Sequence, residues 1–443
     1  MSKKKTARIN NINETSFFYR QRCFLFFFAF FIVYQFTVVN HCRIVPTNGL
    51  TYTYHLLDFS FGFCARFLPG AVYNFISSGD AAVWKVSAWD LFLTLSLFVF
   101  VSYALSRFVL SFEEKEIRQR MFALCLFFVS GAFTFAGFTL TLGVHDLNWL
   151  LLSAAFVFAV QRKYFRPALP VLAVLSALIH YSTLVSYLFL FALLLLFETA
   201  SKQDKKEKRV CALLFFVTVF SCAAVSLYLI ATEKNNLVYD IEAFDRELNL
   251  RSRSGEDAVD DNYFRFALYG DLECYEMIRA VVPRIHPLIG EGSALPAPVV
   301  EVLNKAWQQI SIHIETLKTY PHFYEQLFAE LLLLAPALGF FLRFWIDMIR
   351  RAAARKNRIE VFVFVCAIVQ FPLMIVIWHF MSWDKVRYVT NAFLIQFTLA
   401  LYVMYRRRED AAELIRKYLT KKNAAFAALY YLVYASTALY LYS

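Results

Sequence analysis

The side chains best suited to acid–base or phosphate chemistry stand at the ends of long apolar runs. Asp58 follows the first run, and His145 and Asp146 lie in a short turn between two later runs. His180 interrupts a further apolar stretch. The remaining members of this set are Arg66, His379, Asp384, Lys385 and Arg387. A charge beside a membrane-spanning run is costly, so each residue either serves a function or anchors the chain through an ion pair.

These residue types suit the transfer of a sugar from a polyprenyl-phosphate or polyprenyl-diphosphate donor. A carboxylate such as Asp58 or Asp146 can take the proton from an acceptor hydroxyl. Arg and Lys can bind the departing phosphate, Arg through two parallel hydrogen bonds. The phosphate-binding candidates are Arg66, Lys385 and Arg387. A divalent cation, Mg²⁺ or Mn²⁺, bound by Asp58 and Asp146 would share that role. Without a metal, His180 or His145 would be the base.

The composition explains why these residues sit at the ends of runs. Hydrophobic residues make up 59% of the 443 positions and charged residues 18%, and Phe alone supplies 49. The apolar runs are roughly 16–22 residues long, which is the length that crosses about 30 Å of hydrocarbon. We therefore expect an all-α, polytopic integral membrane protein with about eleven transmembrane helices. The predicted spans are about 23–39, 89–110, 121–142, 148–160, 168–179, 183–198, 210–230, 327–344, 359–378, 388–405 and 424–442.

The positive charges predict the orientation of these spans. The formal net charge is +11, and Lys and Arg gather in short clusters between the apolar runs. This is the pattern of cytoplasmic loops, and it argues against a nucleic-acid-binding surface. The basic start predicts a cytoplasmic N-terminus at 1–22 and a first helix that is retained in the plasma (inner) membrane. All eight His residues then fall on the outer side, which favours a polar site there.

The order of the runs predicts four parts. These are the N-terminus 1–22, an N-terminal transmembrane module 23–230 that includes an outer loop at 40–88, a large outer loop 231–326, and a C-terminal transmembrane module 327–443. The aromatic-rich loop 40–88 predicts helices that lie in the membrane interface. The large loop predicts helical stretches near 262–281 and 298–318. Its acidic part, 240–261, has few apolar residues, and we expect it to be poorly ordered without substrate.

Residues 168–198 form either one long helix or two short ones. The basic cluster Arg162, Lys163 and Arg166 comes before this stretch, and another, from Lys202 to Arg209, comes after it. Both clusters favour the cytoplasm, so the chain crosses an even number of times. This predicts two short helices, or a re-entrant hairpin, with a turn near 180–182. Such half-length helices are tolerated where they line a cavity inside the protein.

Two stretches carry a resemblance to known families. Residues 141–197, with Gly143-Val144-His145-Asp146, then Gln161-Arg162-Lys163-Tyr164-Phe165, then Leu178-Ile179-His180-Tyr181-Ser182, resemble exopolysaccharide and O-antigen polymerases. In those proteins an Arg often opens the fourth span, where His145 and Asp146 stand here. An acidic residue after the first span, followed by amphipathic helices, is similar to the GT-C glycosyltransferases. That superfamily places a catalytic Asp in this loop and often a second acidic residue in the next outer loop, which correspond to Asp58 and Asp146.

Both resemblances imply the same broad function. They imply a membrane glycosyltransferase or polysaccharide polymerase on the outer face, with a lipid-linked sugar donor, a glycan acceptor and, as further partners, membrane lipids and polysaccharide-export proteins. Walker, GxGxxG, HExxH and GxSxG motifs are absent from the sequence, so ATPase, dinucleotide-dependent, zinc-protease and serine-hydrolase functions are not indicated. Two alternatives stay open: a transporter or flippase of lipid-linked glycans, and a non-enzymatic envelope-assembly protein.

Overall fold

The computed structural model describes residues 21–33, 55, 57–65, 67–79, 82–129, 146–236, 287–290, 292–319, 322–381 and 385–442. These residues form α-helices and short 3-10 helices, and no β-strand occurs among them. The chain divides into two compact units. The first unit contains residues 1–44, 94–140 and 400–443, and the second contains 45–93 and 141–399. The all-helical prediction is confirmed, whereas the four-part division by membrane side stays a prediction.

The first unit packs its helices through Phe side chains. Its helices are Gln21–Val33, the C-terminal part of α4 (Val83–Leu110), α5 (Lys115–Val129), α17 (Arg408–Tyr418) and α18 (Lys421–Tyr442). The Phe31 ring stacks on the Phe98 ring with centroids 5.5 Å apart, and Phe27 contacts Phe122 at 5.1 Å. Phe27 and Phe31 are fully buried. Some of the many Phe residues in the sequence therefore pack between helices.

Arg120 satisfies carbonyl groups at the end of α17. Its guanidinium donates to the backbone oxygens of Arg416 at 3.2 Å and Leu419 at 3.1 Å. The last carbonyls of a helix have no partner within the helix, and a basic side chain is a common donor to them. Arg416 in turn forms an ion pair with Glu114 and donates a hydrogen bond to its carboxylate. This hydrogen bond raises the pKa of the Arg416 guanidinium. These contacts connect α17 with the start of α5.

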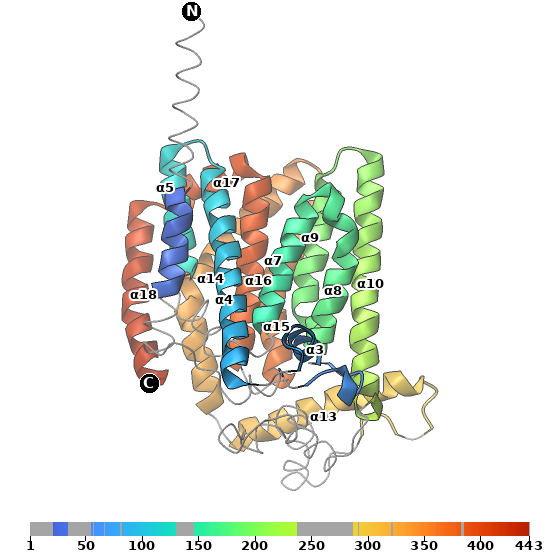
Figure 1. Ribbon diagram of the computed structural model, residues 1–443. Helices are drawn as coiled ribbons and strands as arrows, with labels where there is room; N and C mark the ends of the chain where they lie inside the picture. Colours follow the sequence, from blue (N-terminus) through green and yellow to red (C-terminus); the bar gives the residue numbers. More distant parts are fainter. Residues whose placement is uncertain are drawn as a thin grey trace, which may run out of the picture. The chain divides into compact units, whose positions relative to one another are not determined.

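The second unit holds most of the residues that sequence analysis selects. Its α-helices are α3 (Phe67–Ser77), α7 (Asp146–Gln161), α8 (Leu169–Ile179), α9 (Tyr187–Ser201), α10 (Lys205–Asn236), α13 (Ala297–Thr319), α14 (His322–Ala354), α15 (Arg358–Met381) and most of α16 (Lys385–Arg406). Three 3-10 helices, η2 (Phe59–Phe61), η4 (Lys163–Ala168) and η5 (Tyr181–Val185), connect them. Figure 1 shows α7 to α10 and α14 to α16 side by side, with α13 running across one end.

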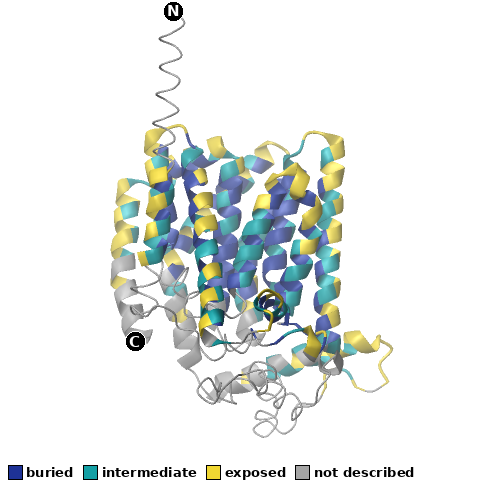
Figure 2. Ribbon diagram, viewed as in Figure 1, coloured by how far each residue is buried: buried dark blue, intermediate teal, exposed yellow. Residues whose placement is uncertain are grey.

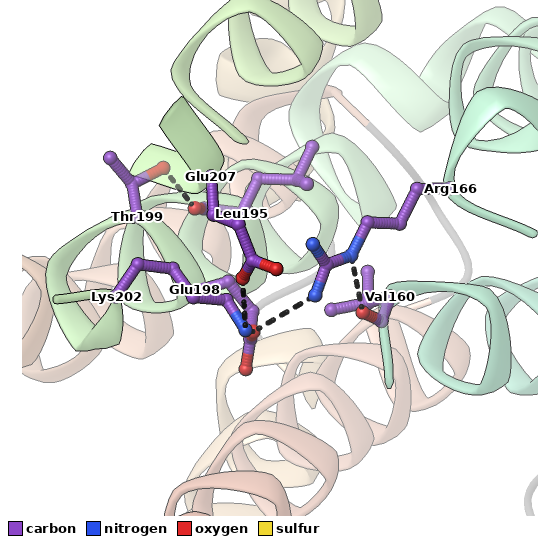
Figure 3. A network of polar contacts seen from close by, with 7 residues as sticks. All are labelled: Val160, Arg166, Leu195, Glu198, Thr199, Lys202 and Glu207. Atoms are coloured by element: carbon purple, nitrogen blue, oxygen red, sulfur yellow. Dashed lines mark hydrogen bonds and ion pairs between the residues drawn. The ribbon is translucent and has the colours of Figure 1, made fainter. Parts of the chain in front are cut away.

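Helices α8 and α9 form a hairpin whose turn is η5. The α8 helix ends at Ile179, where the following residue leaves the helical conformation, and α9 begins at Tyr187. The two ends of the hairpin that are far from the turn lie together, because Arg166 Nη2 is 3.7 Å from Glu198 Oε2 (Figure 3). Both arms pack on α10. The turn predicted near 180–182 is confirmed, and the two basic clusters that flank the hairpin lie at one end of the unit.

Four of the described helices are long and apolar enough to cross a membrane. They are Trp84–Leu110, Lys205–Thr232, Arg358–Ile377 and Tyr388–Arg406. Shorter apolar helices occupy Gln21–Val33, Leu147–Gln161 and Tyr187–Ser201. Each predicted span overlaps a helix, while the count of about eleven crossings stays a prediction. Figure 2 shows exposed residues along one side of α10, and these include Phe216, Phe220 and Leu213. An exposed apolar face of this length suits contact with lipid.

The two outer loops are partly described. Within the first, α3 is a helix whose exposed residues include Val72, Phe75 and Ile76, and the predicted helix in this loop is confirmed. Within the second, the helix predicted at 298–318 is confirmed as α13. The stretch predicted at 262–281 and the acidic part 240–261 lie outside the described residues. The membrane-interface location of α3 stays a prediction.

An amide network joins α14, α15 and α16 inside the second unit. Trp345 donates its indole N–H to Gln396 Oε1 at 2.8 Å. Gln396 Nε2 donates to Gln370 Oε1 at 2.5 Å and also to the backbone oxygen of Ala367. All three side chains are buried. Hydrogen bonds of this kind join helices where apolar surroundings offer no water as an alternative partner.

Candidate functional site

A buried polar cluster surrounds the turn of the α8–α9 hairpin. Trp149, on α7, donates its indole N–H to the backbone oxygen of Ser176 at 3.0 Å. Thr183 donates its hydroxyl to the same oxygen at 2.7 Å. The two donors come from different helices and meet at the last turn of α8, where the Ser176 carbonyl also accepts the His180 N–H at 3.3 Å. The sequence Ser-Ala-Leu-Ile-His-Tyr-Ser-Thr thus folds as a helix end followed by a turn that α7 holds in place.

His180 occupies the centre of this turn. Its Nδ1 accepts a hydrogen bond from the Ser182 N–H at 3.0 Å, which caps the start of η5. The ring lies 5.9 Å from the Trp149 ring and 4.5 Å from the Tyr181 ring, and His180 is buried. Because Nδ1 is the acceptor, the neutral imidazole carries its proton on Nε2. This tautomer makes His180 a hydrogen-bond donor through Nε2, a role different from the general base that its residue type suggests.

Tyr187 connects the hairpin with α16. Its hydroxyl lies 2.5 Å from Asn391 Oδ1, and its ring lies 5.3 Å from the Trp149 ring. Residues three or four apart lie on one face of a helix. Asp146 therefore stands one turn before Trp149 on α7, and Arg387 stands one turn before Asn391 on α16. Side-chain contacts through Trp149, Tyr187 and Asn391 thus link the start of α7, the turn at His180 and the first two turns of α16.

Several buried hydroxyls near this cluster have no hydrogen-bond partner among the described residues. They are Ser153, Ser176, Ser182 and Thr390. A buried hydroxyl without a partner costs free energy, on the order of 1–3 kcal/mol. These four groups lie on α7, α8, η5 and α16. We refer to Trp149, His180, Ser182, Tyr187 and Asn391 as the hairpin-turn cluster.

Asp58 has a structural task that its position in the first loop did not reveal. Its Oδ1 accepts from the Ser60 N–H at 2.9 Å and from the Ser60 hydroxyl at 2.5 Å. Its Oδ2 accepts from Asn74 Nδ2 at 2.8 Å, so the carboxylate joins η2 to α3. Asp58 is half-buried and caps η2. Within the described side chains, no group of three or more His, Cys, Asp or Glu could hold a metal ion. A cation shared by Asp58 and Asp146 stays a prediction.

Sequence analysis missed a buried pair beside Asp58. His55 Nε2 lies 3.2 Å from Asp90 Oδ1, and both residues are buried. The edge of the His55 ring meets the Tyr73 ring at 5.3 Å, and Tyr73 precedes Asn74 on α3. The signal was present, because Asp90 is an acidic residue at the start of an apolar run and such residues need a partner. The pair positions the chain before α3 against α4.

The remaining candidates have no described side-chain geometry. Arg66, His145 and Asp384 lie outside the described residues. His379 lies near the end of α15, and Lys385 begins α16. Of the nine residues selected from the sequence, the structure therefore places the side chains of Asp58 and His180, and it places the backbone of Asp146, His379, Lys385 and Arg387.

An ionic network lies at the end of the hairpin opposite the turn (Figure 3). Lys202 Nζ lies 3.3 Å from Glu198 Oε2 and 3.5 Å from Glu207 Oε2. Arg166 contacts the same Glu198 oxygen and donates through Nε to the Val160 carbonyl at 3.2 Å. Two cations and two carboxylates balance in charge here. The network fastens η4, α9 and α10 together, and it accounts for basic residues that the sequence indicated only as topological signals.

No protein-family model matches the chain, and neither a curated protein nor a solved structure matches it.

Proposed function

We propose that the chain is a multi-pass protein of the plasma (inner) membrane that transfers sugar units on the outer face. Its donor is a polyprenyl-phosphate- or polyprenyl-diphosphate-linked sugar, and its acceptor is a glycan. The arrangement of about eleven spans, the GT-C-like fold, the interfacial location of α3 and the cytoplasmic N-terminus belong to this proposal. The observation that carries it is the convergence of the starts of α7 and α16 on the hairpin-turn cluster through Trp149, Tyr187 and Asn391.

The topology supports an outer location for this cluster. The hairpin begins and ends beside basic segments, around Arg166 and Lys202, which favour the cytoplasmic side. Its turn lies at the other end. A lipid-linked donor keeps its chain in the bilayer and presents its phosphate at the membrane boundary. A polar cluster between apolar helices, on the outer side and beneath that boundary, is where such a phosphate would meet protein groups.

The reaction assigns a role to each element. As Asp146 takes the proton of the acceptor hydroxyl, that oxygen forms a bond to the anomeric carbon of the donor sugar. The bond from this carbon to the phosphate oxygen breaks, and its electron pair leaves with the phosphate. Lys385 and Arg387 stabilise the negative charge that grows on the phosphate, and the start of α16 adds its helix dipole. His180 donates a hydrogen bond through Nε2 to the sugar or the phosphate.

A reconstituted assay tests this proposal. The protein is placed in lipid nanodiscs with lipid-linked sugars extracted from the source organism, and released polyprenyl phosphate or diphosphate and extended glycan are measured by mass spectrometry. Asp146→Asn and Arg387→Ala each lower turnover by about 100-fold or more. The matched controls are Asp204→Asn, a surface cap that Asn also provides, and Arg350→Ala, whose side chain is 74% exposed. Both controls keep parental turnover.

Other outcomes would separate the alternatives. Donor that moves across the bilayer with its sugar–phosphate bond intact indicates a transporter or flippase. Equal turnover in all four variants removes Asp146 and Arg387 from the reaction and contradicts the proposed site. A glycan defect in cells that appears only when the protein level falls, measured by immunoblot, indicates an assembly role.

A further inference from the structure

Three exposed aromatic rings lie together beside Asp58. The rings of Phe59 and Phe63 stack with centroids 5.6 Å apart and an angle of 24° between their planes. The Phe63 ring lies 6.3 Å from the ring of Tyr228, near the outer end of α10. Phe59, Phe63 and Tyr228 are 37%, 45% and 51% exposed. We refer to these three rings as the aromatic platform.

The local sequence fixes the orientation of the Phe59 and Phe63 rings. Asp58 caps η2, and the Gly62 N–H donates to the Phe59 carbonyl at 3.2 Å, which closes a tight turn. Gly62 has φ of 133°, a conformation that residues with a side chain rarely adopt. The glycine reverses the chain so that Phe63 returns over Phe59. Four consecutive features, a cap, a short helix, a glycine turn and a ring stack, thus fix two rings in one orientation.

Polar groups of fixed orientation border the rings. Asp58 precedes Phe59, its carboxylate is half-buried, and its oxygens are held by Ser60 and Asn74. Ser60 is exposed beside it. The combination of flat apolar rings with a carboxylate, an amide and a hydroxyl suits a molecule that has an apolar face and a polar rim. A pyranose sugar is such a molecule, because its axial C–H groups form one face and its hydroxyls surround the ring.

We propose that the aromatic platform binds a pyranose unit of the glycan acceptor. This inference rests on the proposed glycosyl transfer and names the part of the protein that holds the acceptor. The sugar stacks its C–H face on Phe63 and Phe59. Its hydroxyls donate to the Asp58 carboxylate or to the Ser60 hydroxyl oxygen, or accept from the Asn74 amide. Asp58 then contributes to acceptor binding, while the acid–base step stays with the start of α7.

Membrane anchoring is the other use of exposed aromatic rings, and the platform differs from it in composition. Rings at a membrane boundary are mostly Trp and Tyr, whose polar atom reaches the headgroups. Two of the three platform residues are Phe, and the three rings touch one another instead of spreading along the boundary. The neighbouring helix α3 already presents Phe75, which is 88% exposed, and Ile76 for anchoring. The fixed carboxylate beside the rings favours a sugar over a lipid chain.

Binding of oligosaccharides tests the proposal independently of turnover. The probe is a set of oligosaccharides of about six sugars, made by mild acid hydrolysis of the surface glycan of the source organism. Binding to the full chain in nanodiscs is measured by saturation-transfer NMR and calorimetry. Phe63→Ala weakens binding about tenfold or more, and so does Phe63→Leu, which keeps an apolar side chain without a flat ring. Phe75→Ala, the matched control on α3, changes binding less than twofold.

The results separate this inference from the proposed function. Saturable binding that is lost in both Phe63 variants, in a protein that releases no polyprenyl phosphate, supports the platform and contradicts the transfer reaction. Transfer at parental rate in Phe63→Ala, with oligosaccharide binding unchanged, contradicts the platform and leaves the transfer reaction intact. Unchanged oligosaccharide binding with weaker lipid association of Phe63→Ala assigns the rings to membrane anchoring and overturns the proposal. Absence of saturable binding in the parental protein also overturns it.

Discussion

The Tyr187 hydroxyl lies 2.5 Å from Asn391 Oδ1, and this contact joins residues that are 204 positions apart in the chain. Both side chains are buried. Because Tyr187 begins α9 and Asn391 lies two turns into α16, the contact sets the height of α16 relative to the hairpin turn. It therefore joins the second turn of α16 to the first residue of α9, which follows the hairpin turn.

Removal of this contact is expected to destabilise the second unit. Tyr187→Phe keeps the ring against Trp149 but removes the hydroxyl donor, and we expect a loss of about 0.5–2 kcal/mol in unfolding free energy. The double-mutant cycle with Asn391→Leu measures the coupling directly, by thermal unfolding in detergent. A coupling energy of zero would show that the two side chains do not interact in solution. Phe158→Leu, on an exposed part of α7, serves as the control substitution.

The two nitrogen atoms of His180 are expected to have separable roles. In His180→Asn, the Asn side-chain oxygen can still accept from the Ser182 N–H, whereas the donor at Nε2 is lost. We expect near-parental thermal stability with turnover lowered by about 100-fold, the usual effect of losing one donor at a reacting group. His180→Ala loses both functions and is expected to lower stability as well. Equal turnover in His180→Asn and the parental protein would assign His180 to the cap alone.

Glu198 is expected to contribute more to stability than Glu207. Glu198 is 1% exposed and contacts both Arg166 and Lys202, whereas Glu207 contacts Lys202 at the surface. Removing one partner from a buried ionic network costs about 3–5 kcal/mol, because the remaining charges lose their compensation. Exposed pairs contribute about 0–1 kcal/mol. Glu198→Gln should therefore lower the midpoint of chemical unfolding much more than Glu207→Gln, and the reverse order would contradict the network in Figure 3.

The amide network of α14, α15 and α16 is expected to depend on Gln396 more than on Gln370. Gln396 accepts from Trp345 and donates to Gln370 and to the Ala367 carbonyl, so Gln396→Met removes three hydrogen bonds at nearly constant volume. Gln370→Met removes one of these three, together with the contact of Gln370 Nε2 with Met374 Sδ. We expect a loss of about 1–3 kcal/mol for Gln396→Met and a smaller loss for Gln370→Met. Tryptophan fluorescence follows the unfolding of both variants, and only Gln396→Met removes the partner of the Trp345 indole N–H in the folded protein.

The helices and the hairpin turn could be predicted from the sequence because they follow from local signals. Apolar runs between basic clusters predicted helices that overlap those observed, and the clusters around Arg166 and Lys202 predicted the return of the chain at residues 180–182. The helix α13 followed from a helical stretch that comes after a segment broken by proline and glycine residues. These signals depend on residues that are close in the sequence.

The polar contacts could not be predicted in the same way. Apolar periodicity does not tell which helix faces which, so the contact between Tyr187 and Asn391 has no signature in the sequence. Asp90, at the start of an apolar run, indicated that a partner was needed, but not that this partner is His55. Asp58 shows the opposite case. The Asp-x-Ser pattern at 58–60 is a known local capping pattern. This pattern predicts the contact of the Asp58 carboxylate with Ser60, but not its contact with Asn74, which lies 16 residues further along the chain.

Because the two helices of the hairpin are short, the turn at His180 would lie inside the bilayer and not at its surface. The α8 and α9 helices have 11 and 15 residues and so rise only about 16 and 22 Å from their basic ends, less than the roughly 30 Å of a hydrocarbon core. Tyr228, by contrast, lies more than 30 Å along α10 by the same helical rise, roughly at the far boundary. In a bilayer, His180 would thus stand on the order of 10 Å beneath the level of the aromatic platform. The phosphate of a lipid-linked donor would therefore contact the hairpin-turn cluster from within the membrane. A glycan acceptor from the water phase would have to enter the protein below the aromatic platform to reach it.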